Sequence, residues 1–267
     1  MHAVEKLNKR QRQERILARL ANTVAVRIAT LAAEYQVTTE TIRRDLDELA
    51  GRGLLARTYG GAAGRALASE PGVKARAQTL VAERQRIARC AAAFVSSGDV
   101  LMIDAGSTTT HLAEALMQNT FELKVITNSL GAARLLGQSD TIEVTLCPGD
   151  LRWTEEAVYG AETLAFLDRF HADFAFIGAG GFTPDEVTDA DAQAAWVKRK
   201  MNARCKRAVL IADHQKAGLT QFAHVCAIGD LDDLVTDAAL PPEFAEAFAG
   251  AGVQLHIAER SPADLAA

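Results

Sequence analysis

Hydrophobic positions recur with a helical spacing in the first fifty residues of the chain. Apolar side chains there stand three or four positions apart, which places them along one face of an α-helix. Each stripe is single-sided, so the helices that carry them should pack on one another. The stripes cover Ile16–Leu20, Ile28–Tyr35 and Ile42–Leu49. They predict a small helical domain, which is followed by a predicted strand over Leu54–Tyr59.

Beyond residue 80 the pattern changes to short apolar runs, rich in Val, Ile and Phe, that alternate with helical stretches. Such alternation is typical of an α/β domain with a largely parallel sheet. The predicted strands are Val100–Ile103, Leu123–Thr127, Ile142–Leu146, Phe174–Ile177, Ala208–Ala212 and Leu234–Val235. The predicted helices lie near Ile87–Val95, Thr109–Met117, Leu130–Leu136, Ala192–Cys205 and Glu243–Phe248.

A passage rich in Gly, Ala and Ser separates the two patterns. It runs from Gly60 to Gly72 and contains the first proline of the chain, Pro71. Because Gly and Pro interrupt regular structure, this composition predicts a linker. We therefore predict an N-terminal domain over residues 1–60, a linker over residues 61–79 and an α/β domain over residues 80–257.

The amino-acid composition limits the classes of protein to which this chain can belong. Of the 267 residues, 49% are hydrophobic and 24% are charged, an ordinary balance for a globular protein. No run of about 18 apolar residues and no secretory signal is visible, so we expect no membrane contact and a cytoplasmic location. The four cysteines are widely spaced and contain no C-x-x-C pair. We therefore expect neither a metal site nor a cofactor.

Charge is distributed unevenly along the chain. Residues 1–60 carry 11 Lys and Arg against 7 Asp and Glu, whereas the remainder carries 18 against 27. A basic module joined to an acidic body fits a DNA-binding domain attached to a regulatory domain. A solvated basic helix would give the same count, so charge alone does not decide between them.

The second and third predicted helices have helix-turn-helix proportions. Gln36 and Val37 form the turn, and the Thr38 hydroxyl can cap the third helix. Opposite its apolar stripe this helix presents charged residues that can enter the major groove, where Arg pairs with guanine or phosphate. The predicted DNA contacts are Thr38, Thr39, Glu40, Thr41, Arg43 and Arg44, with Arg57 in a wing near the phosphates. The same pattern suits a three-helix bundle with a solvated charged face.

Polar loops follow three of the predicted strands of the α/β domain. Ligands of open parallel sheets bind at the carboxyl ends of strands, and glycines, hydroxyls and helix N-termini there suit an anion. We interpret Asp104 and Asp213 as acceptors for sugar hydroxyls, and Lys198 or Lys216 as the cation for a phosphate. The predicted binding residues are Asp104, Gly106, Ser107, Thr108, Thr109, Thr127, Asn128, Ser129, Lys198, Asp213 and Lys216. A capped helix start would explain the Gly-Ser-Thr-Thr run equally well.

Residues 37–62, VTTETIRRDLDELAGRGLLARTYGGA, closely resemble the N-terminal signature of the DeoR family of bacterial repressors. The T-I-R-R-D-L motif is matched without a gap, and Tyr59 stands where the family usually has His. D-x-G-S-T-T, T-N-S, D-F-A-F-I-G-A, V-K-R-K-M, A-D-x-x-K and V-T-D then follow in the family's order. The resemblance covers roughly residues 8 to 237.

This resemblance implies a winged helix-turn-helix that binds double-stranded operator DNA. It also implies a sensor domain similar to ribose-5-phosphate isomerase and the coenzyme A transferases, with a phosphorylated sugar as effector. We therefore expect a homo-oligomeric repressor of a sugar or polyol catabolic operon, not an enzyme. The alternative is a sugar-phosphate isomerase-like enzyme, which the fold permits although no motif places a general base.

Two departures from the family's pattern concern the sensor. Cys147-Pro148-Gly149 replaces the usual Gly-Gly, and Pro148 lacks a backbone donor. His214 and Gln215 replace the two serines of the usual D-S-S-K, and their bulk can alter the choice of effector.

Overall fold

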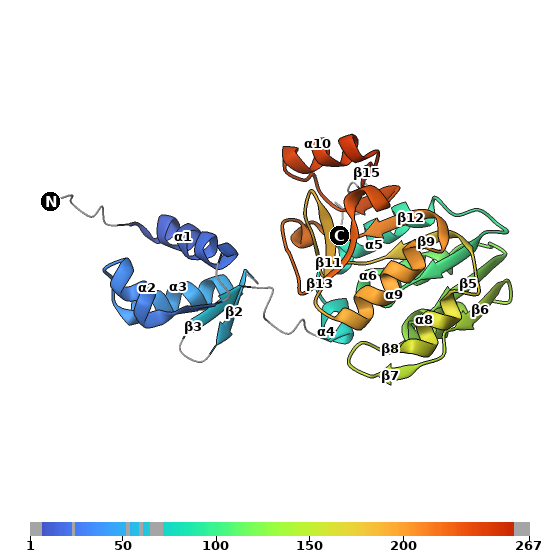
Figure 1. Cartoon of the computed structure of the whole chain (residues 1–267), viewed down its shortest axis with the longest axis horizontal. Helices are drawn as coiled ribbons and strands as arrows, with labels where there is room; N and C mark the ends of the chain where they lie inside the picture. The colour runs from blue at the N-terminus through green and yellow to red at the C-terminus, as the bar shows by residue number, and fades with distance from the viewer. Residues whose placement is uncertain (1–6, 23–24, 52–53, 59–60, 65–71, 259–267) are drawn as a thin grey trace. The chain divides into compact units, whose positions relative to one another are not determined.

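The computed structural model describes residues 7–22, 25–51, 54–58, 61–64 and 72–258. The chain forms two compact units, Met1–Ser69 and Glu70–Ala267, which are traced in Figure 1. We describe each unit by itself.

The N-terminal unit is a winged helix-turn-helix. Its helices are α1 (Lys9–Asn22), α2 (Ile28–Glu34) and α3 (Thr39–Gly51), and its strands are β1 (Ala25–Arg27), β2 (Leu55–Thr58) and β3 (Gly61–Gly64). The three predicted apolar stripes meet in one core, where Ile16, Leu31, Ile42, Leu46 and Leu49 are fully buried. The strands form an antiparallel sheet with β3 in the middle. The three predicted helices and the strand after them are therefore confirmed, except that Tyr59 lies outside the described residues.

Strand β3 and helix α4 (Val73–Ala77) both occupy part of the predicted linker. The prediction that a linker begins at residue 61 is therefore corrected, because residues 61–64 pair with both other strands of the wing. Small residues explain the error, since Gly-Ala-Ala-Gly carries almost no hydrophobic signal. Gly61 is needed for close approach, because a Cβ atom there would lie 2.0 Å from the Val26 carbonyl oxygen.

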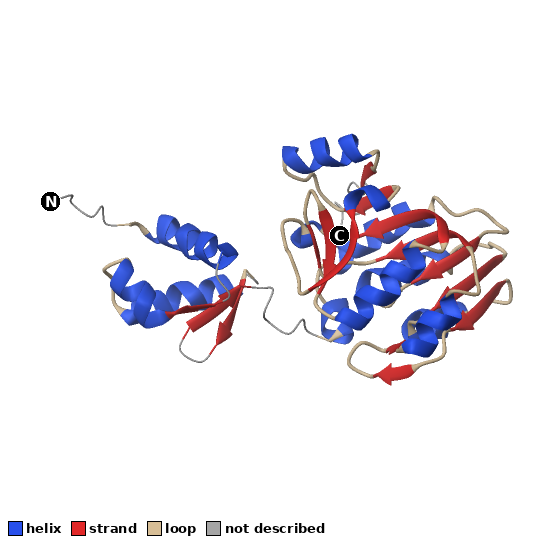
Figure 2. Cartoon of the chain, in the orientation of Figure 1, coloured by secondary structure: helices blue, strands red, loops and turns tan. Residues whose placement is uncertain are grey.

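The C-terminal unit is built on a seven-stranded, wholly parallel sheet (Figure 2). The strand order is β15-β14-β12-β9-β4-β5-β6. The bounds are β4 (Val100–Ile103), β5 (Leu123–Thr127), β6 (Ile142–Leu146), β9 (Ala172–Ile177), β12 (Cys205–Ile211), β14 (Asp233–Thr236) and β15 (Gln254–Ile257). All six predicted strands are confirmed to within a few residues, and β15 was not predicted.

Helices cover both faces of this sheet. One face packs against α5 (Val81–Ala92), α6 (Ser107–Leu116) and α7 (Leu130–Leu136), and the other against α8 (Ala161–Leu167), α9 (Ala192–Asn202) and α10 (Pro242–Ala251). Side chains alternate between the two cores, so that Leu101 and Ile103 belong to one and Met102 to the other. Such two-sided burial explains why the central strands read as continuous apolar runs.

Short elements flank the main sheet and were not predicted. Strands β7 (Asp150–Arg152) and β8 (Ala157–Tyr159) form a hairpin. Strands β10 (Gly181–Phe182), β11 (Glu186–Asp189) and β13 (Ala223–Ala227) form a small antiparallel sheet. A 3₁₀ helix, η2 (His214–Lys216), follows β12.

The order of strands reverses between β4 and β9. The chain passes from β4 outward to β5 and β6, and then returns to place β9, β12, β14 and β15 on the other side of β4. The loops that leave β4 and β9 therefore diverge, and open α/β sheets bind ligands at such a point. Asp104 follows β4, and Gly178 follows β9.

Within the described ranges, no helix is long and apolar enough to cross a membrane. Nor do the described residues include a cluster of three or more His, Cys, Asp or Glu that could hold a metal ion.

Candidate functional site

The start of α3 is held by a side-chain cap. The Thr38 hydroxyl oxygen accepts a hydrogen bond of 3.1 Å from the Thr41 backbone N–H, and the two hydroxyl oxygens lie 2.9 Å apart. This is the cap expected from the sequence. Gln36, in the preceding turn, has a positive φ of 52°, which reverses the chain between α2 and α3. The local sequence thus fixes where α3 begins and how it leaves the turn.

Charged residues line the outer face of α3. Glu40, Arg43 and Arg44 are exposed, and the Arg44 side chain is 80% accessible. Glu40 pairs with both arginines, at 2.9 Å to Arg43 Nη1 and 3.4 Å to Arg44 Nε. Exposed ion pairs of this kind contribute little, about 0–1 kcal/mol. Both guanidinium groups can therefore exchange Glu40 for a phosphate or a guanine at small cost.

Asp45, in the same motif, faces the opposite way. It is buried and forms an ion pair with the Arg12 guanidinium of α1, which is also buried. The carboxylate thus ties α1 to α3 beneath the exposed arginines. Sequence reasoning assigned no partner to Asp45. Its position between Ile42 and Leu49, on the apolar side of the helix, was the available signal.

Of two other predicted DNA contacts, Thr39 is placed in full and Arg57 only in part. Thr39 is exposed on the first turn of α3. Arg57 lies on β2 of the wing, but its side chain is outside the described part of the structure. Its contact with phosphate stays a prediction.

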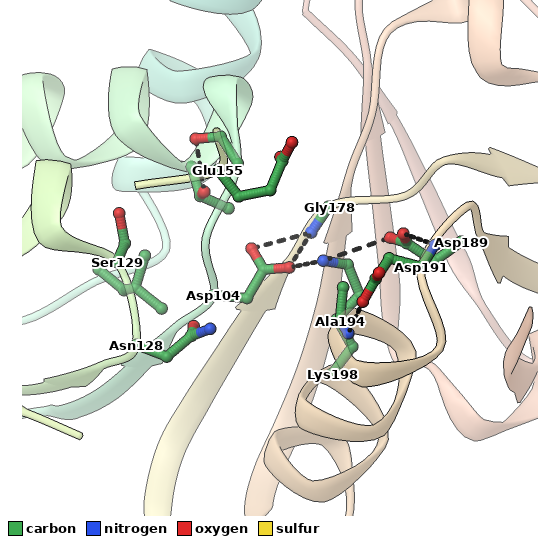
Figure 3. A network of polar contacts seen from close by, with 12 residues as sticks. Asp104, Asn128, Ser129, Glu155, Gly178, Asp189, Asp191, Ala194 and Lys198 are labelled. Atoms are coloured by element: carbon green, nitrogen blue, oxygen red, sulfur yellow. Dashed lines mark hydrogen bonds and ion pairs between the residues drawn. The ribbon is translucent and has the colours of Figure 1, made fainter. Parts of the chain in front are cut away.

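The C-terminal unit buries an ion pair at the reversal point of its sheet. Asp104 is 1% exposed and pairs with the Lys198 ammonium of α9, which is 4% exposed (Figure 3). The Asp104 carboxylate also accepts from the Gly178 N–H, at 3.2 and 3.3 Å. Lys198 Nζ lies 3.5 Å from a second carboxylate, Asp189. Asp104, which follows β4, and Asp189, at the end of β11, therefore converge on one ammonium group.

The charge of Lys198 is already matched by these carboxylates. Burial by itself lowers the pKa of Lys198, but the negative charges of Asp104 and Asp189 outweigh it and raise that pKa. Burial raises the pKa of Asp104, and Lys198 opposes that rise. We conclude that Lys198 stays protonated and that its positive charge is neutralised by Asp104 and Asp189. The predicted role as the counter-charge of a phosphate therefore fits it poorly.

An uncapped helix N-terminus lies beside this pair. Helix α6 begins after Gly106 with no side-chain cap, although four hydroxyl residues follow. The hydroxyls of Thr109 and Thr110 instead donate to the Gly106 carbonyl, at 3.0 and 2.7 Å. The first N–H groups of a helix carry partial positive charge and attract anions. Ser107 and Thr108 are both buried on this first turn, and their contact with an effector stays a prediction.

Asn128, after β5, contributes an unused acceptor. Its Nδ2 donates to the Val158 carbonyl at 3.1 Å, whereas its Oδ1 is buried and accepts no hydrogen bond from any described residue. Buried polar atoms of native proteins are rarely left without a partner. Figure 3 shows Asn128 and Ser129 on one side of Asp104, and Gly178 and Lys198 on the other.

The neighbours of Asn128 are occupied within the fold. The Thr127 hydroxyl donates to the Ile103 carbonyl at 2.6 Å and accepts from the Ser129 N–H at 3.0 Å. The Ser129 hydroxyl oxygen caps α7 by accepting from the Ala132 N–H at 3.2 Å. These two hydroxyls therefore shape the loop that presents Asn128.

The loop after β12 is arranged differently from the prediction. The Asp213 carboxylate accepts from the buried Arg84 guanidinium at 3.1 Å and from the Gln215 N–H at 3.1 Å. Asp213 is thus engaged by Arg84, which argues for a structural role and not for the predicted contact with sugar hydroxyls. His214 is held by Asp237 at 2.8 Å. Lys216 is half-buried at the end of η2 and remains the candidate cation of this loop.

Several residues near the ion pair were not predicted. They are Tyr159, Gly178 and Asp189, with Arg152 and Asp191 beside them. Burial raises the pKa of Tyr159, whose phenol also senses the charges of Lys198 and Asp104. Asp191 caps α9 through the Ala194 N–H and pairs with Arg152. The glycine-rich run Gly178–Gly181 after a strand was the one signal that pointed here.

Comparison with known proteins matches both units. The DeoR C terminal sensor domain matches residues 79–238, and the DeoR-like helix-turn-helix domain matches residues 12–65. The HTH-type transcriptional repressor GlcR of Bacillus subtilis (strain 168) is 32% identical over 84% of this chain and 87% of its own. The Glycerol-3-phosphate regulon repressor of Escherichia coli (strain K12) is 30% identical over 92% of this chain and 98% of its own.

Among solved structures, the chain is similar to ribose 5 phosphate isomerase A from Neisseria gonorrhoeae. The TM-score is 0.39 and the identity 19%, over 51% of this chain and 53% of that chain. The translation initiation factor eIF-2B of Pyrococcus horikoshii OT3 gives a TM-score of 0.37 and 18% identity, over 80% of this chain and 74% of that chain.

Proposed function

The chain belongs to the DeoR family of transcriptional repressors, and from this premise we propose that it represses a sugar or polyol catabolic operon. A phosphorylated sugar bound by the C-terminal unit releases it from its operator. The observation that carries the proposal is that one chain combines an exposed, capped recognition helix with a buried polar site at the reversal point of a parallel sheet.

Helix α3 reads the operator through Arg43 and Arg44. Each can pair bidentately with the O6 and N7 atoms of guanine in the major groove, or with a phosphate. Glu40 holds both guanidinium groups over the helix face before DNA arrives. Arg57 in the wing adds a phosphate contact, which positions the protein without reading sequence.

The effector lies across the carboxyl ends of β4 and β5. Its phosphate binds the first turn of α6 at Ser107 and Thr108, through their hydroxyl groups and through the backbone N–H groups of the helix N-terminus, which suit an anion. Lys216 supplies the positive charge that faces the phosphate. The hydroxyl groups of the effector donate to Asn128 Oδ1 and to Asp104, and Lys198 and Gly178 hold Asp104 in place. This arrangement requires an effector that has both a phosphate and a hydroxyl group.

Two copies of the chain act together. Operators of helix-turn-helix proteins mirror protein symmetry, with half-sites spaced by about one helical turn. Release then follows when the effector favours the protein state that fits the operator less well, since a ligand shifts an equilibrium only by its differential affinity.

The test combines DNA selection with a thermal-shift screen of the full chain. An operator duplex is selected from a random pool, and the protein is then heated with glycerol 3-phosphate, ribose 5-phosphate, glucose 6-phosphate or 6-phosphogluconate. A bound compound at a hundredfold excess over Kd should stabilise the protein by about 2.7 kcal/mol. The matched unphosphorylated sugars should give no shift. Recovery of no preferred duplex, or equal shifts with and without the phosphate, would contradict the proposal.

A further inference from the structure

The C-terminal unit begins with a docked segment, which we call the strap, over residues 72–79 including α4. The chain reaches the strap directly after residues 65–71, so it is the first described part of this unit. The Val73 side chain is buried, and its N–H donates to the Thr154 carbonyl at 2.9 Å. Gly72 allows this approach, because a Cβ atom there would lie 2.8 Å from the same carbonyl oxygen. The strap is therefore fitted against the turn between β7 and β8.

Ion pairs fasten the strap to that turn. Arg76 Nη2 lies 2.8 Å from Glu155 Oε2, and both side chains are mostly buried. Lys74 Nζ lies 3.0 Å from Glu156 Oε1, with the lysine exposed. A partly buried pair resists solvent screening better than an exposed one. Arg76 and Glu155 therefore make the stronger fastening.

The same turn is bonded to the effector loop. The Leu130 N–H donates to the Glu156 carbonyl at 2.8 Å. Asn128 and Val158 exchange two hydrogen bonds, from the Val158 N–H to the Asn128 carbonyl at 2.9 Å and from Asn128 Nδ2 to the Val158 carbonyl at 3.1 Å. A shift of Asn128 towards a ligand therefore pulls on the hairpin that holds the strap.

The turn also reaches the ion pair on α9. Arg152 Nη1 lies 2.5 Å from Asp191 Oδ2. The Asp191 N–H donates to Asp189 Oδ1 at 3.1 Å, and Asp189 faces Lys198. The polar groups on both sides of Asp104 are thus linked to one short turn.

Arg84 gives the strap a second attachment. Its guanidinium is buried on α5 and donates to the Arg76 carbonyl of the strap. The same guanidinium binds Asp213 Oδ2 at 3.1 Å, in the loop that carries Lys216. The strap is therefore connected to the loops after β5 and β12 by separate routes.

We propose that the strap is the device that carries effector occupancy from the C-terminal unit to the DNA-binding unit. This inference rests on the proposed function. Effector contacts at Asn128 and in the Lys216 loop change how the turn and Arg84 hold the strap. A change in the strap passes to the N-terminal unit along the chain, because the strap is the first described part of the C-terminal unit. In this proposal the Arg76–Glu155 pair is docked in one state, as the structure has it, and released in the other, which gives the two-state element that such coupling needs.

The test measures operator affinity and effector binding separately in the full chain. Variants Arg76→Met and Glu155→Gln break the fastening, whereas Lys200→Met breaks a pair of equal length, 2.8 Å to Asp168, between α9 and the end of α8. Anisotropy of the selected operator duplex gives Kd with and without glycerol 3-phosphate, ribose 5-phosphate or glucose 6-phosphate. Thermal shifts with the same three compounds report binding.

We expect the wild type and Lys200→Met to lose roughly 5- to 150-fold in operator affinity with the compound that binds. The two strap variants should keep the thermal shift but lose less than about twofold in affinity. If they release DNA as the wild type does, the strap inference is wrong while the proposed function stands. If neither these three compounds nor 6-phosphogluconate binds the wild type, both fail.

Hydrogen exchange in the unmodified protein gives a second test that needs no variant to fold. Exchange of the backbone amides at residues 73–79 should change when the binding compound is added, because their docking changes. Amides in α10, which contacts neither the strap nor its turn in the interactions above, should exchange as before. Unchanged strap amides in a protein that does release DNA would overturn the inference.

Discussion

Arg43 and Arg44 stand next to Asp45 in the chain, yet they face different surroundings. The arginines are exposed and pair with Glu40, whereas Asp45 is buried against Arg12. Helical geometry separates them, because neighbouring residues point about 100° apart. A six-residue motif can therefore hold both the DNA contacts and the ion pair that supports them.

Replacing Arg43 or Arg44 with Ala should weaken operator binding by about 1–3 kcal/mol where a bidentate base contact is lost. The measurement is operator affinity by gel shift or anisotropy. Lys206→Ala, which removes an exposed cation of the C-terminal unit, should leave affinity unchanged. Unchanged affinity in both arginine variants would remove the recognition-helix assignment.

Breaking the buried pair at Arg12 and Asp45 should destabilise the N-terminal unit. Removing one partner leaves the other charge buried and unpaired, which typically lowers the free energy of unfolding by about 3–5 kcal/mol. Asp45→Leu alone should therefore lower the unfolding temperature of this unit. The double variant Arg12→Met with Asp45→Leu should recover most of that loss, since apolar pairs often replace buried ion pairs. Circular dichroism in a thermal scan distinguishes the two, and a double variant as unstable as the single would refute the argument.

Asn128 and Asn202 make a matched pair for testing the effector site. Each donates through Nδ2 to a carbonyl, and each has an Oδ1 that accepts from no described residue. Only Asn128 follows a strand at the carboxyl edge. Asn128→Ala should cost the effector about 1 kcal/mol, roughly a fivefold rise in Kd. Asn202→Ala should not change Kd, and equal effects in calorimetric titration would place the effector elsewhere.

At the scale of elements, hydrophobic period and length decided what could be predicted. Strands such as Val100–Ile103 and Leu123–Thr127 were located to the residue, because burial on both faces makes most of their positions apolar. Hairpin β7–β8 was missed because three-residue strands carry no period. Strand β3 was missed because its Gly-Ala sequence reads as linker.

The candidate site was predictable only as far as it depends on strand ends. Asp104 and Asn128 were found because polar residues after apolar strands collect at one edge. Lys198 was predicted from its charge, as a candidate cation on the helix predicted at Ala192–Cys205. The partners that fix their roles come from other segments. Asp189 beside Lys198 and Arg84 beside Asp213 are juxtaposed by the fold alone. No local pattern could show that the charge of Lys198 is already matched.

The wing offers a test of its close backbone approach. Gly61→Ala should force β3 away from β1, since the new Cβ would meet the Val26 carbonyl at 2.0 Å. Both the stability of the N-terminal unit and operator affinity should fall. Gly51→Ala is the control, because nothing lies within 4 Å of its added Cβ, and Ala is the better helix former. Equal tolerance of both changes, judged by thermal unfolding, would mean that β1 and β3 do not pair this closely.

The whole molecule joins an N-terminal basic unit to an acidic sensor, and operator binding should show that charge. Phosphate contacts release counterions, so affinity should fall by roughly a thousandfold or more between 50 and 200 mM salt. A titration of Kd against salt concentration measures this slope. An association that does not depend on salt would contradict binding through phosphates.

The most direct measurement is the affinity of the full chain for its selected operator, with and without the sugar phosphate that stabilises it. The account predicts a drop of roughly 5- to 150-fold when that compound is present. It also predicts no drop in a variant that combines Thr108→Ala with Lys216→Ala, which should still bind the operator. An operator affinity that no sugar phosphate changes, or an undiminished response in that variant, would contradict it.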